Sequence, residues 1–335
     1  MKEKMTILVT GGAGFIGSHV TEMLLRMGCE VVVIDNFSTG SKENLKRLEG
    51  YEGLWVVPSS VYSLPESYPE GVVYPDAIIH LGQPSSSPLY WQYPEYFHKT
   101  IEEMQIILEL AYKWCCPVIY ASSSSVYASN DIPWREDMAI QPWDRYSEVK
   151  YICERMGFLW AKRQKIKFIA LRLFSVYGEG EEFKGRYANL FTQLIWSAIT
   201  GKTLKIYGDG DQSRDLVYVK DVTHAFFDAL ILAFEKEPGF HDVYNVGSGY
   251  HLDIRQMIDI IRDIGRVEPK VEYLLYYPKY YIMHTLADTI KTKSELGWRA
   301  CTSPKEVVRY LIKYYEARKD KLDKWNPNPP TYFKK

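Results

Sequence analysis

The fold is decided near the start of the chain by residues 6–20, which read TILVTGGAGFIGSHV. The β-branched run at 6–10 predicts a short buried strand that meets a glycine-rich turn, and the residues from Gly14 to about Met27 follow a helical pattern. A second apolar run, CEVVVID, ends at Asp35 and predicts another buried strand. Together these segments predict a β-α-β unit with two parallel strands.

The same alternation continues to residue 173. Further buried strands are predicted at 54–57, 77–81, 117–122 and 167–173, and helices at 94–114 and 146–164. Strands that alternate with helices favour an α/β fold with a doubly wound parallel sheet.

The pattern of alternating strands and helices changes after Arg172. Glycine-rich and charged loops there alternate with helices near 187–199 and 219–235. We therefore expect a sheet domain of residues 1–173, to which about 216–246 cross back, and a smaller α/β lobe of about 174–215 and 247–320. The acidic stretch EGEEFKG at 179–185 is expected to be a solvated loop that can close as a lid. The proline-rich residues 321–335 are expected to form a loose surface tail.

Gly11, Gly14 and Gly17 have the spacing of a dinucleotide-binding turn. The first glycine permits the tight turn, the second lets the backbone approach a pyrophosphate, and the third lets the helix pack closely, while the helix N-terminus offers N–H groups to the anion. Asp35 ends the next strand, where a carboxylate accepts hydrogen bonds from a ribose hydroxyl pair and repels a 2′-phosphate. The pattern predicts NAD in preference to NADP. The alternative is a structural glycine turn with Asp35 merely ending its strand.

Tyr146 and Lys150 lie four residues apart, about twenty residues after the serine run ASSSSVY of 121–127. At this spacing the two side chains share one helical face. A phenol has a pKa near ~10, and a fixed ammonium together with a positive nicotinamide ring would favour the phenolate. Such a phenolate can take a proton from a substrate hydroxyl while the carbinol hydride leaves for NAD, with a hydroxyl of the serine run holding the same oxygen. Taken alone the pair is more typical of a solvated helix surface, but after a dinucleotide fingerprint it predicts a proton-transfer site.

The composition argues against several classes of partner. With 41 basic and 42 acidic residues, the chain has no charge excess that would attract nucleic acid or an anionic membrane. No apolar run approaches the roughly 20 residues of a membrane span, and we expect no signal peptide. The adjacent Cys115 and Cys116 make a poor disulfide framework, which favours a reducing, cytoplasmic setting. The cysteines have no metal-ligand spacing with the histidines, so no metal is expected.

Eight segments spread along nearly the whole chain carry a family resemblance: TGGAGFIGSHV, DNFSTG, SSSSVY, YSEVK, RLFSVYG, IYGDGDQSRDLVYVKDV, YNVGSG and ELGW. In these segments the chain resembles the extended short-chain dehydrogenases/reductases, and most of all their nucleotide-sugar epimerase branch, typified by UDP-glucose 4-epimerase. The resemblance implies an NAD-binding Rossmann domain, a C-terminal lobe that binds a nucleotide sugar, and a homodimer formed through helices near 93–114 and 145–164.

The resemblance also implies roles for individual residues. Tyr146 matches the acid/base, Lys150 its modulator, which also holds the nicotinamide ribose, and Ser123 the catalytic hydroxyl. The implied cofactor-binding residues are Gly11, Gly14, Phe15, Ile16, Gly17, Asp35, Asn36, Ser38 and Leu81, together with Tyr146 and Lys150. The implied substrate-binding residues are Ser124, which faces the sugar, Ser175, Tyr207, and Asn189 and Arg214, which match positions that hold the nucleotide diphosphate.

The residue two before Tyr127 separates branches of this family, because sugar-nucleotide dehydratases and decarboxylases usually carry Glu there and this chain has Ser125. A 4-epimerase needs no second acid, since it oxidises C4, lets the 4-keto sugar turn over, and returns the hydride to the other face. We therefore expect an NAD-dependent nucleotide-sugar 4-epimerase that acts on UDP-glucose, UDP-galactose or a close relative. Two alternatives stay open: a dehydratase, decarboxylase or reductase of the same family, and a non-catalytic NAD-binding scaffold.

Several positions depart from the family pattern. Ser175 and Thr100 stand where the family usually has asparagine, and Ser59 or Ser60 stands where an aspartate usually binds the adenine amine. The usual C-terminal arginine is missing, and Lys279 is the cation we expect in its place, without the bidentate fork. The segment HLGQPSSSP replaces the usual HLAA beside the active site. We expect these changes to bear on the identity of the sugar and to leave the cofactor chemistry intact.

Overall fold

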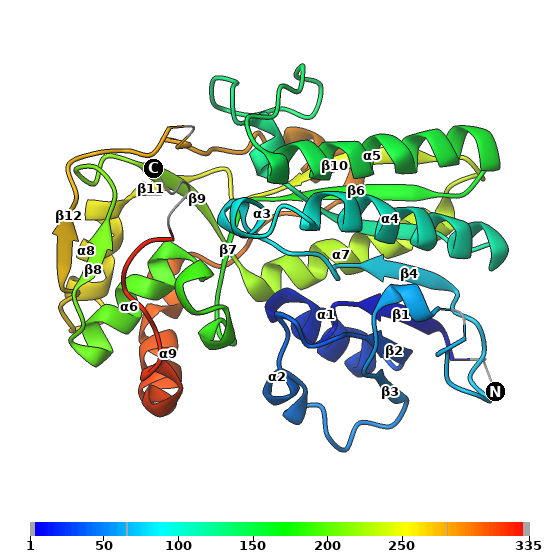
Figure 1. Cartoon of the computed structure of the whole chain (residues 1–335), viewed down its shortest axis with the longest axis horizontal. Helices are drawn as coiled ribbons and strands as arrows, with labels where there is room; N and C mark the ends of the chain where they lie inside the picture. Colours follow the sequence, from blue (N-terminus) through cyan, green and yellow to red (C-terminus); the bar gives the residue numbers. More distant parts are fainter. Residues whose placement is uncertain (1–3, 65, 280, 331–335) are drawn as a thin grey trace.

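A computed structural model of the protein describes residues 4–64, 66–279 and 281–330. Its largest element is a seven-stranded parallel sheet with the strand order β10-β6-β5-β4-β1-β2-β3 (Figure 1). The strands are β1 (Thr6–Thr10), β2 (Glu30–Ile34), β3 (Leu54–Val57), β4 (Ala77–His80), β5 (Val118–Ser123), β6 (Phe168–Leu173) and β10 (His241–Val246).

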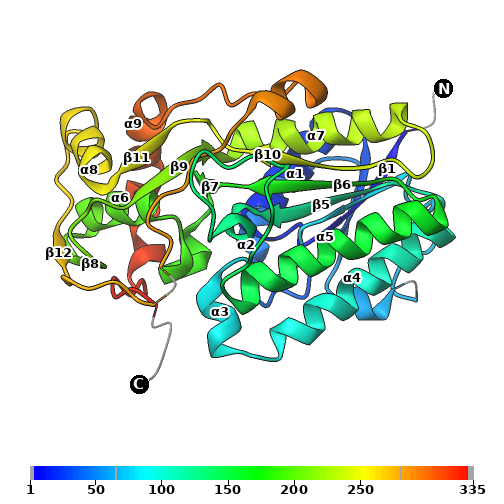
Figure 2. The same ribbon diagram turned by 90° about the horizontal axis from the view of Figure 1, so that it is seen from above.

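Helices cover both faces of this sheet (Figure 2). One face packs against α1 (Phe15–Arg26) and α7 (Val219–Glu235), and the other against α4 (Tyr96–Lys113) and α5 (Arg145–Gln164). In β1, Ile7 and Val9 belong to the core under α1 and α7, whereas Leu8 belongs to the core under α4 and α5. Because both faces are buried, the strand is a continuous apolar run. The predicted α/β fold with a doubly wound parallel sheet is confirmed.

A smaller lobe follows β6 and packs around a separate core (Figure 1). It contains a three-stranded sheet, β11-β9-β7, and the strand pair β12-β8. The chain returns to the large sheet through α7 and β10, and the residue ranges proposed for the two domains stay predictions. Among the described residues, no helix combines the length and the apolar character that crossing a bilayer requires.

The remaining elements have the following bounds. The strands are β7 (Ser175–Tyr177), β8 (Leu204–Ile206), β9 (Ser213–Tyr218), β11 (His251–Asp253) and β12 (Val271–Tyr273). The helices are α2 (Lys42–Lys46), α3 (Ser87–Gln92), α6 (Leu190–Thr200), α8 (Ile254–Asp263) and α9 (Pro304–Glu316), with the short 3₁₀ helices η1 (Val61–Ser63), η2 (Ser124–Tyr127), η3 (Glu182–Tyr187) and η5 (Lys319–Leu322) and the π-helical turn η4 (Thr292–Leu296).

The order of the strands reverses at β1, which lies between β2 and β4. In open α/β sheets, ligands bind beyond the carboxyl ends of the strands at such a reversal. Thr10 and His80 end β1 and β4 in register, and Thr10 Oγ1 lies 2.7 Å from His80 Nδ1 in a hydrogen bond. The fold therefore places the glycine turn after β1 beside the loop after β4.

The three glutamates of the stretch 179–185 are buried, so its prediction as a solvated lid is wrong. The side chains of Glu179, Glu181 and Glu182 are each less than a tenth exposed. Glu179 pairs with Lys220 at 2.8 Å, and Glu181 accepts hydrogen bonds from the Thr192 hydroxyl and a backbone N–H. Donors in the smaller lobe and on α7 thus offset the cost of burying these carboxylates.

The described part of the predicted loose tail is packed, which is a second correction. Leu322 and Trp325 are buried in the core of the smaller lobe. The Lys202 ammonium donates to the carbonyl oxygens of Leu322, Asp323 and Trp325. Residues 331–335 lie outside the described residues.

At the far edge of the large sheet, β3 is half-exposed and not buried as predicted, because it is the last strand.

A buried ion pair joins α5 to the middle of the sheet. Glu154 on α5 accepts two hydrogen bonds from the Arg172 guanidinium on β6, at 2.7 and 3.0 Å, and their side chains are 0% and 3% exposed. Ser122 on β5 donates to the same carboxylate at 2.5 Å, and Arg172 donates to the Tyr127 hydroxyl at 2.6 Å. Each charge is thus paired, and removing one partner would leave the other charge buried in the core without a partner.

We predict that Glu154→Leu lowers the free energy of unfolding by about 3–5 kcal/mol, because it leaves the Arg172 charge buried without its partner. Urea unfolding followed by circular dichroism measures this loss. Glu43→Leu is the control: it removes a carboxylate whose partner Lys46 is exposed, and it should leave the transition nearly unchanged. Equal destabilisation by the two substitutions would contradict the structural role of the buried pair.

Candidate active site

The glycine turn after β1 shows the close approaches that the sequence predicts. Gly11 has a φ of +69°, and a Cβ on it would lie 2.6 Å from the Cα of Gly82. A Cβ on Gly17 would lie 2.1 Å from the carbonyl oxygen of Gly11. Gly14 is the N-cap of α1. A side chain at Gly11 or Gly17 would therefore clash with protein backbone, and glycine lets the turn pack against the loop after β4 and against the N-terminus of the helix.

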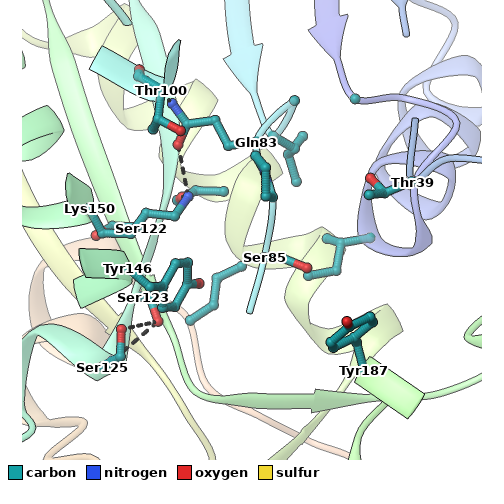
Figure 3. Close-up of a pocket in the computed structure, with 18 of the residues that line it drawn as sticks. Thr39, Gln83, Ser85, Thr100, Ser122, Ser123, Ser125, Tyr146, Lys150 and Tyr187 are labelled. Atoms are coloured by element: carbon teal, nitrogen blue, oxygen red, sulfur yellow. Dashed lines mark hydrogen bonds between the residues drawn. The ribbon is translucent and has the colours of Figure 1, made fainter. Parts of the chain in front are cut away.

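One cavity of about 720 Å³ extends from this turn to the smaller lobe, a size typical of ligand sites (Figure 3). Residues predicted from the sequence line it from end to end. They are Gly11, Gly14, Phe15, Ile16, Gly17, Asp35, Asn36, Ser38, Leu81, Ser123, Ser124, Tyr146, Lys150, Ser175, Asn189 and Arg214. Tyr207 is not among the lining residues, and its hydroxyl donates to the carbonyl oxygen of Pro330 at 3.1 Å.

Asp35 lies just beyond β2 with 7% of its surface exposed. Its carboxylate accepts the N–H of Ala13 at 2.9 Å and the N–H of Phe37 at 2.8 Å. Burial raises the pKa of the Asp35 carboxyl above its ordinary value, and these two donors oppose the rise. Because a carboxylate has about four acceptor positions, it can still receive hydroxyls of a ligand while it holds the loop.

Tyr146 lies in the first turn of α5. Asp144 is the N-cap of this helix and forms a capping box with Ser147. Burial raises the pKa of the Tyr146 phenol to about 12, a hydrogen bond with Ser123 lowers it, and the charge of Asp144 raises it further. Ser123 ends β5 and accepts hydrogen bonds from the backbone N–H and the hydroxyl of Ser125, at 3.2 and 2.9 Å (Figure 3). The phenol and the Ser123 hydroxyl thus meet at one point of the cavity wall.

Lys150 lies one turn further along α5 and is 4% exposed. Its ammonium donates to Gln83 Oε1 and to the carbonyl oxygen of Ala121, each at 2.9 Å. It lies 5.9 Å from the centroid of the Tyr146 ring. Burial lowers the pKa of the Lys150 ammonium to about 8, although acidic groups around it oppose the fall.

The electrostatics of the ligand-free site differ in one respect from the prediction. We expected the Lys150 ammonium together with the positive nicotinamide ring to favour the phenolate, whereas in the protein by itself burial and the charge of Asp144 raise the pKa of the Tyr146 phenol. The Lys150 ammonium donates to Gln83 and to the carbonyl of Ala121 and has no part in this shift. The phenol is therefore protonated in the ligand-free protein near neutral pH.

The half of the cavity in the smaller lobe is built from residues with structural hydrogen bonds. Asn189 caps α6 by accepting the N–H of Phe191 at 2.9 Å, and its amide also donates to the carbonyl of Val176. Arg214 on β9 donates to two backbone carbonyls, and its guanidinium carbon lies 5.4 Å from the centroid of the Tyr281 ring. The structure thus brings both predicted diphosphate contacts to the cavity and holds them in place.

Some lining residues were missed by the sequence analysis. Lys184 lines the cavity, whereas Lys279, the cation expected there, does not. The Lys184 ammonium lies 5.4 Å from the centroid of the Phe15 ring, next to the glycine turn. Gln83 and Glu103 also line the cavity. Only the departure of HLGQPSSSP from the usual HLAA gave a signal for Gln83, and nothing in the sequence pattern marked Glu103.

With this geometry in view, residues 7–247 match the model of the NAD dependent epimerase/dehydratase family. The match covers the large sheet from β1 to β10 and the turn, the strand-end acid and the Tyr/Lys pair described above. The chain belongs to this family. It is therefore an enzyme of the NAD-dependent epimerase/dehydratase group, and NAD is its cofactor.

Relatives within the family differ in their reactions. UDP-glucuronic acid decarboxylase 1 of Danio rerio is 28% identical over 327 residues, which cover 94% of this chain and 73% of that protein. The structure of UDP-N-acetylglucosamine 4-epimerase from Methanobrevibacter ruminantium M1, in complex with UDP-N-acetylmuramic acid, matches with a TM-score of 0.84 at 28% identity, covering 94% of this chain and 99% of that one. MoeE5 in complex with UDP-glucuronic acid and NAD matches with a TM-score of 0.78 at 27% identity, covering 93% of this chain and 99% of that one.

The residues present fit NAD. The tight turn at Gly11 and Gly17, both of which line the cavity, suits a pyrophosphate, and Asp35 suits an unphosphorylated ribose. On the nicotinamide side, Lys150 has two of its three N–H groups engaged by the protein, which leaves one for a ribose hydroxyl.

We predict that Asp35→Asn weakens NAD binding at least about tenfold, because the variant loses a charged acceptor for the ribose hydroxyls. The preference for NAD over NADP should fall as well, since the charge that repels a 2′-phosphate is gone. Isothermal titration of the cofactor-free protein with both dinucleotides measures the two dissociation constants. Unchanged constants for both would contradict the placement of the ribose at Asp35.

Proposed function

We propose that the protein is an NAD-dependent nucleotide-sugar 4-epimerase that acts through a transient 4-keto sugar on a UDP-sugar, of which UDP-glucose and UDP-galactose are the first candidates. The observation that carries the proposal is the wall of the cavity where the Tyr146 phenol meets the Ser123 hydroxyl, with Lys150 one helical turn away. A phenol, a hydroxyl and an ammonium in this order suit proton transfer at a carbinol.

Each of these side chains has a role at the C4 hydroxyl of the sugar. The Tyr146 phenolate accepts the proton of the C4 hydroxyl, while the Ser123 hydroxyl donates a hydrogen bond to the oxygen of that hydroxyl. We expect the Lys150 ammonium, together with the positive nicotinamide ring of bound NAD, to oppose the burial that raises the pKa of the phenol. The chemistry that NAD supplies when bound is reversible hydride transfer with C4. Tyr146 returns the proton when the sugar is reduced again.

The surroundings of the phenol favour epimerisation of a neutral sugar. Ser125 takes the position at which decarboxylases and dehydratases of the family usually carry Glu, and its hydroxyl is engaged with Ser123. The charge that raises the pKa of the phenol is negative: it belongs to Asp144, which accepts from the N–H and hydroxyl of Ser147 and from the hydroxyl of Ser87. A sugar carboxylate attached beside C4 would meet this charge, and like charges repel in a poorly solvated site.

A second candidate is decarboxylation of a UDP-uronic acid. The observation that favours it is the decarboxylase of Danio rerio, with which this chain shares 28% identity over 94% of its length. Oxidation at C4 by the same phenol would serve that reaction as well, so the two candidates differ in the sugar and not in the first step.

Two further properties stay predictions. A homodimer through α4 and α5 is consistent with Tyr112 and Leu159, which lie on these helices and are 53% and 57% exposed. The assignment of Ser124, Ser175, Asn189 and Arg214 to the substrate rests on their place in the cavity wall.

We predict that purified protein, given a panel of UDP-, GDP-, dTDP- and CDP-sugars, converts a neutral UDP-sugar to an isomer of the same mass. Chromatography with mass detection separates the outcomes. Loss of carbon dioxide from a uronic acid would support the second candidate, and loss of water would indicate a dehydratase. Tight NAD binding without conversion of any sugar would overturn both proposals and favour a scaffold.

We predict that Tyr146→Phe lowers turnover by about 10²–10⁴-fold, since it removes the group that accepts the proton. NAD should stay bound, which absorbance of the cofactor released on denaturation measures. Tyr250→Phe, at an exposed position between β10 and β11 and away from the cavity, serves as the control and should keep the wild-type rate. Full activity of Tyr146→Phe would rule out this phenol as the base.

A further inference from the structure

A chain of buried hydrogen bonds connects the glycine turn with Lys150. The Thr10 hydroxyl bonds His80 Nδ1 at 2.7 Å, and His80 Nε2 bonds Gln83 Nε2 at 3.0 Å. Gln83 Oε1 accepts from the Lys150 ammonium at 2.9 Å, and Figure 3 labels both of these residues in the cavity wall. Gln83 Oε1 also accepts from the Tyr120 hydroxyl at 2.9 Å. The side chains of Thr10, His80, Gln83, Tyr120 and Lys150 are all less than a tenth exposed.

The partners fix the orientation of the Gln83 amide. Its oxygen faces two donors, the Lys150 ammonium and the Tyr120 hydroxyl, and its nitrogen faces His80 Nε2. A flipped amide would set an NH₂ group against the ammonium and leave two buried donors without an acceptor. His80 must then accept through Nε2 and donate from Nδ1 to Thr10, which defines its tautomer. Burial, with the charge of Lys150, lowers the pKa of His80 to about 3, so the neutral ring is the form present.

The amide also determines how many donors Lys150 has for ligands. An ammonium has three N–H groups, and Gln83 and the carbonyl of Ala121 take two of them. Both acceptors are neutral and belong to strand ends of the sheet, so they hold the nitrogen in one place. One N–H is left for the cavity that Lys150 lines.

We propose that Gln83 is a positioning residue for Lys150: its amide oxygen keeps the buried ammonium charged and fixed, and its contact through His80 to Thr10 ties that ammonium to the cofactor turn. The proposal rests on the catalytic role assigned to Lys150 under the proposed function. It adds a residue from the segment HLGQPSSSP to the machinery, which explains why a glutamine can stand in a loop otherwise rich in small residues.

Other groups around Lys150 also act on its charge and have to be held constant in a test. Glu103 on α4 and Cys153 and Glu154 on α5 raise the pKa of the ammonium, against the larger effect of burial. Burial raises the pKa of Glu103 itself to about 7, while Lys150 and Lys99 oppose the rise. Both substitutions at Gln83 described below leave Glu103 and Glu154 in place, while they alter a hydrogen bond between Gln83 and the Cys153 thiol.

The test is the pKa of Lys150 in the NAD-loaded protein, followed through the ¹³Cε resonance of labelled lysine and assigned by its loss in Lys150→Met. We expect Gln83→Leu, which removes the acceptor, to lower this pKa by about one unit. We expect Gln83→Glu, which adds a negative acceptor, to raise it by about one unit. The glutamate is accommodated if His80 switches tautomer, since the Thr10 hydroxyl can donate as well as accept.

Tyr120→Phe is the matched control. It removes the other donor to Gln83 Oε1 and leaves the Lys150 contact in place, so the pKa of Lys150 should not fall. The pH profile of kcat/KM provides a second readout. Its high-pH limb should move down in Gln83→Leu and up in Gln83→Glu, because Lys150 loses its charge at a lower or a higher pH.

A pKa of Lys150 that is the same in wild type, Gln83→Leu and Gln83→Glu would overturn the proposal. Should Gln83→Leu fail to fold, the upward shift in Gln83→Glu decides. The resonance is measured without turnover, so the result is independent of the reaction. A shift of the pKa in a protein that converts no nucleotide sugar would support the role of Gln83 and contradict the proposed function.

Discussion

The burial of one ammonium, that of Lys150, is the constraint on which the rest of the site depends. A charge in this position is stable only if the protein supplies acceptors, and the carbonyl of Ala121 and the amide of Gln83 do so from the ends of β5 and β4. These strand ends are brought together by the parallel register of the sheet. The glycine turn, the Tyr/Lys helix and the loop after β4 therefore form one unit at the point where the strand order reverses.

Charges deeper in the protein keep this unit rigid. The Glu154–Arg172 pair connects α5 with β5 and β6 below the site, so the helix that carries Tyr146 and Lys150 is anchored to the strand that carries Ser123. At the mouth, the capping carboxylate of Asp144 starts the same helix and also acts on the phenol. The Glu154–Arg172 pair thus fixes the position of α5, and the N-cap of the same helix, Asp144, raises the pKa of the phenol.

The sequence was sufficient for the parts of the molecule that follow local rules. Periodicity and the spacing of Gly11, Gly14 and Gly17 predict the β-α-β unit, and the placement of Asp35 at a strand end predicts its place in the cavity. Gln83, Lys184 and the buried acids near Glu181 were not predicted, because their partners lie far away in the sequence and no periodic pattern reports them. The residues after 320 look polar and proline-rich, yet two apolar anchors, Leu322 and Trp325, are enough to fix them. The pKa of the phenol depends on its burial, on the hydrogen bond with Ser123 and on the charge of Asp144, which are properties of the folded site alone.

The central claim is that the Tyr146 phenol and NAD act together on C4 of a nucleotide sugar, and substrate deuterated at C4 tests it most directly. The account predicts a primary isotope effect on turnover and a product that keeps the deuterium at C4, because the hydride leaves and returns without contact with water. Turnover in which the deuterium is exchanged into solvent would show that the C4 hydrogen does not leave and return as a hydride, and would contradict the account.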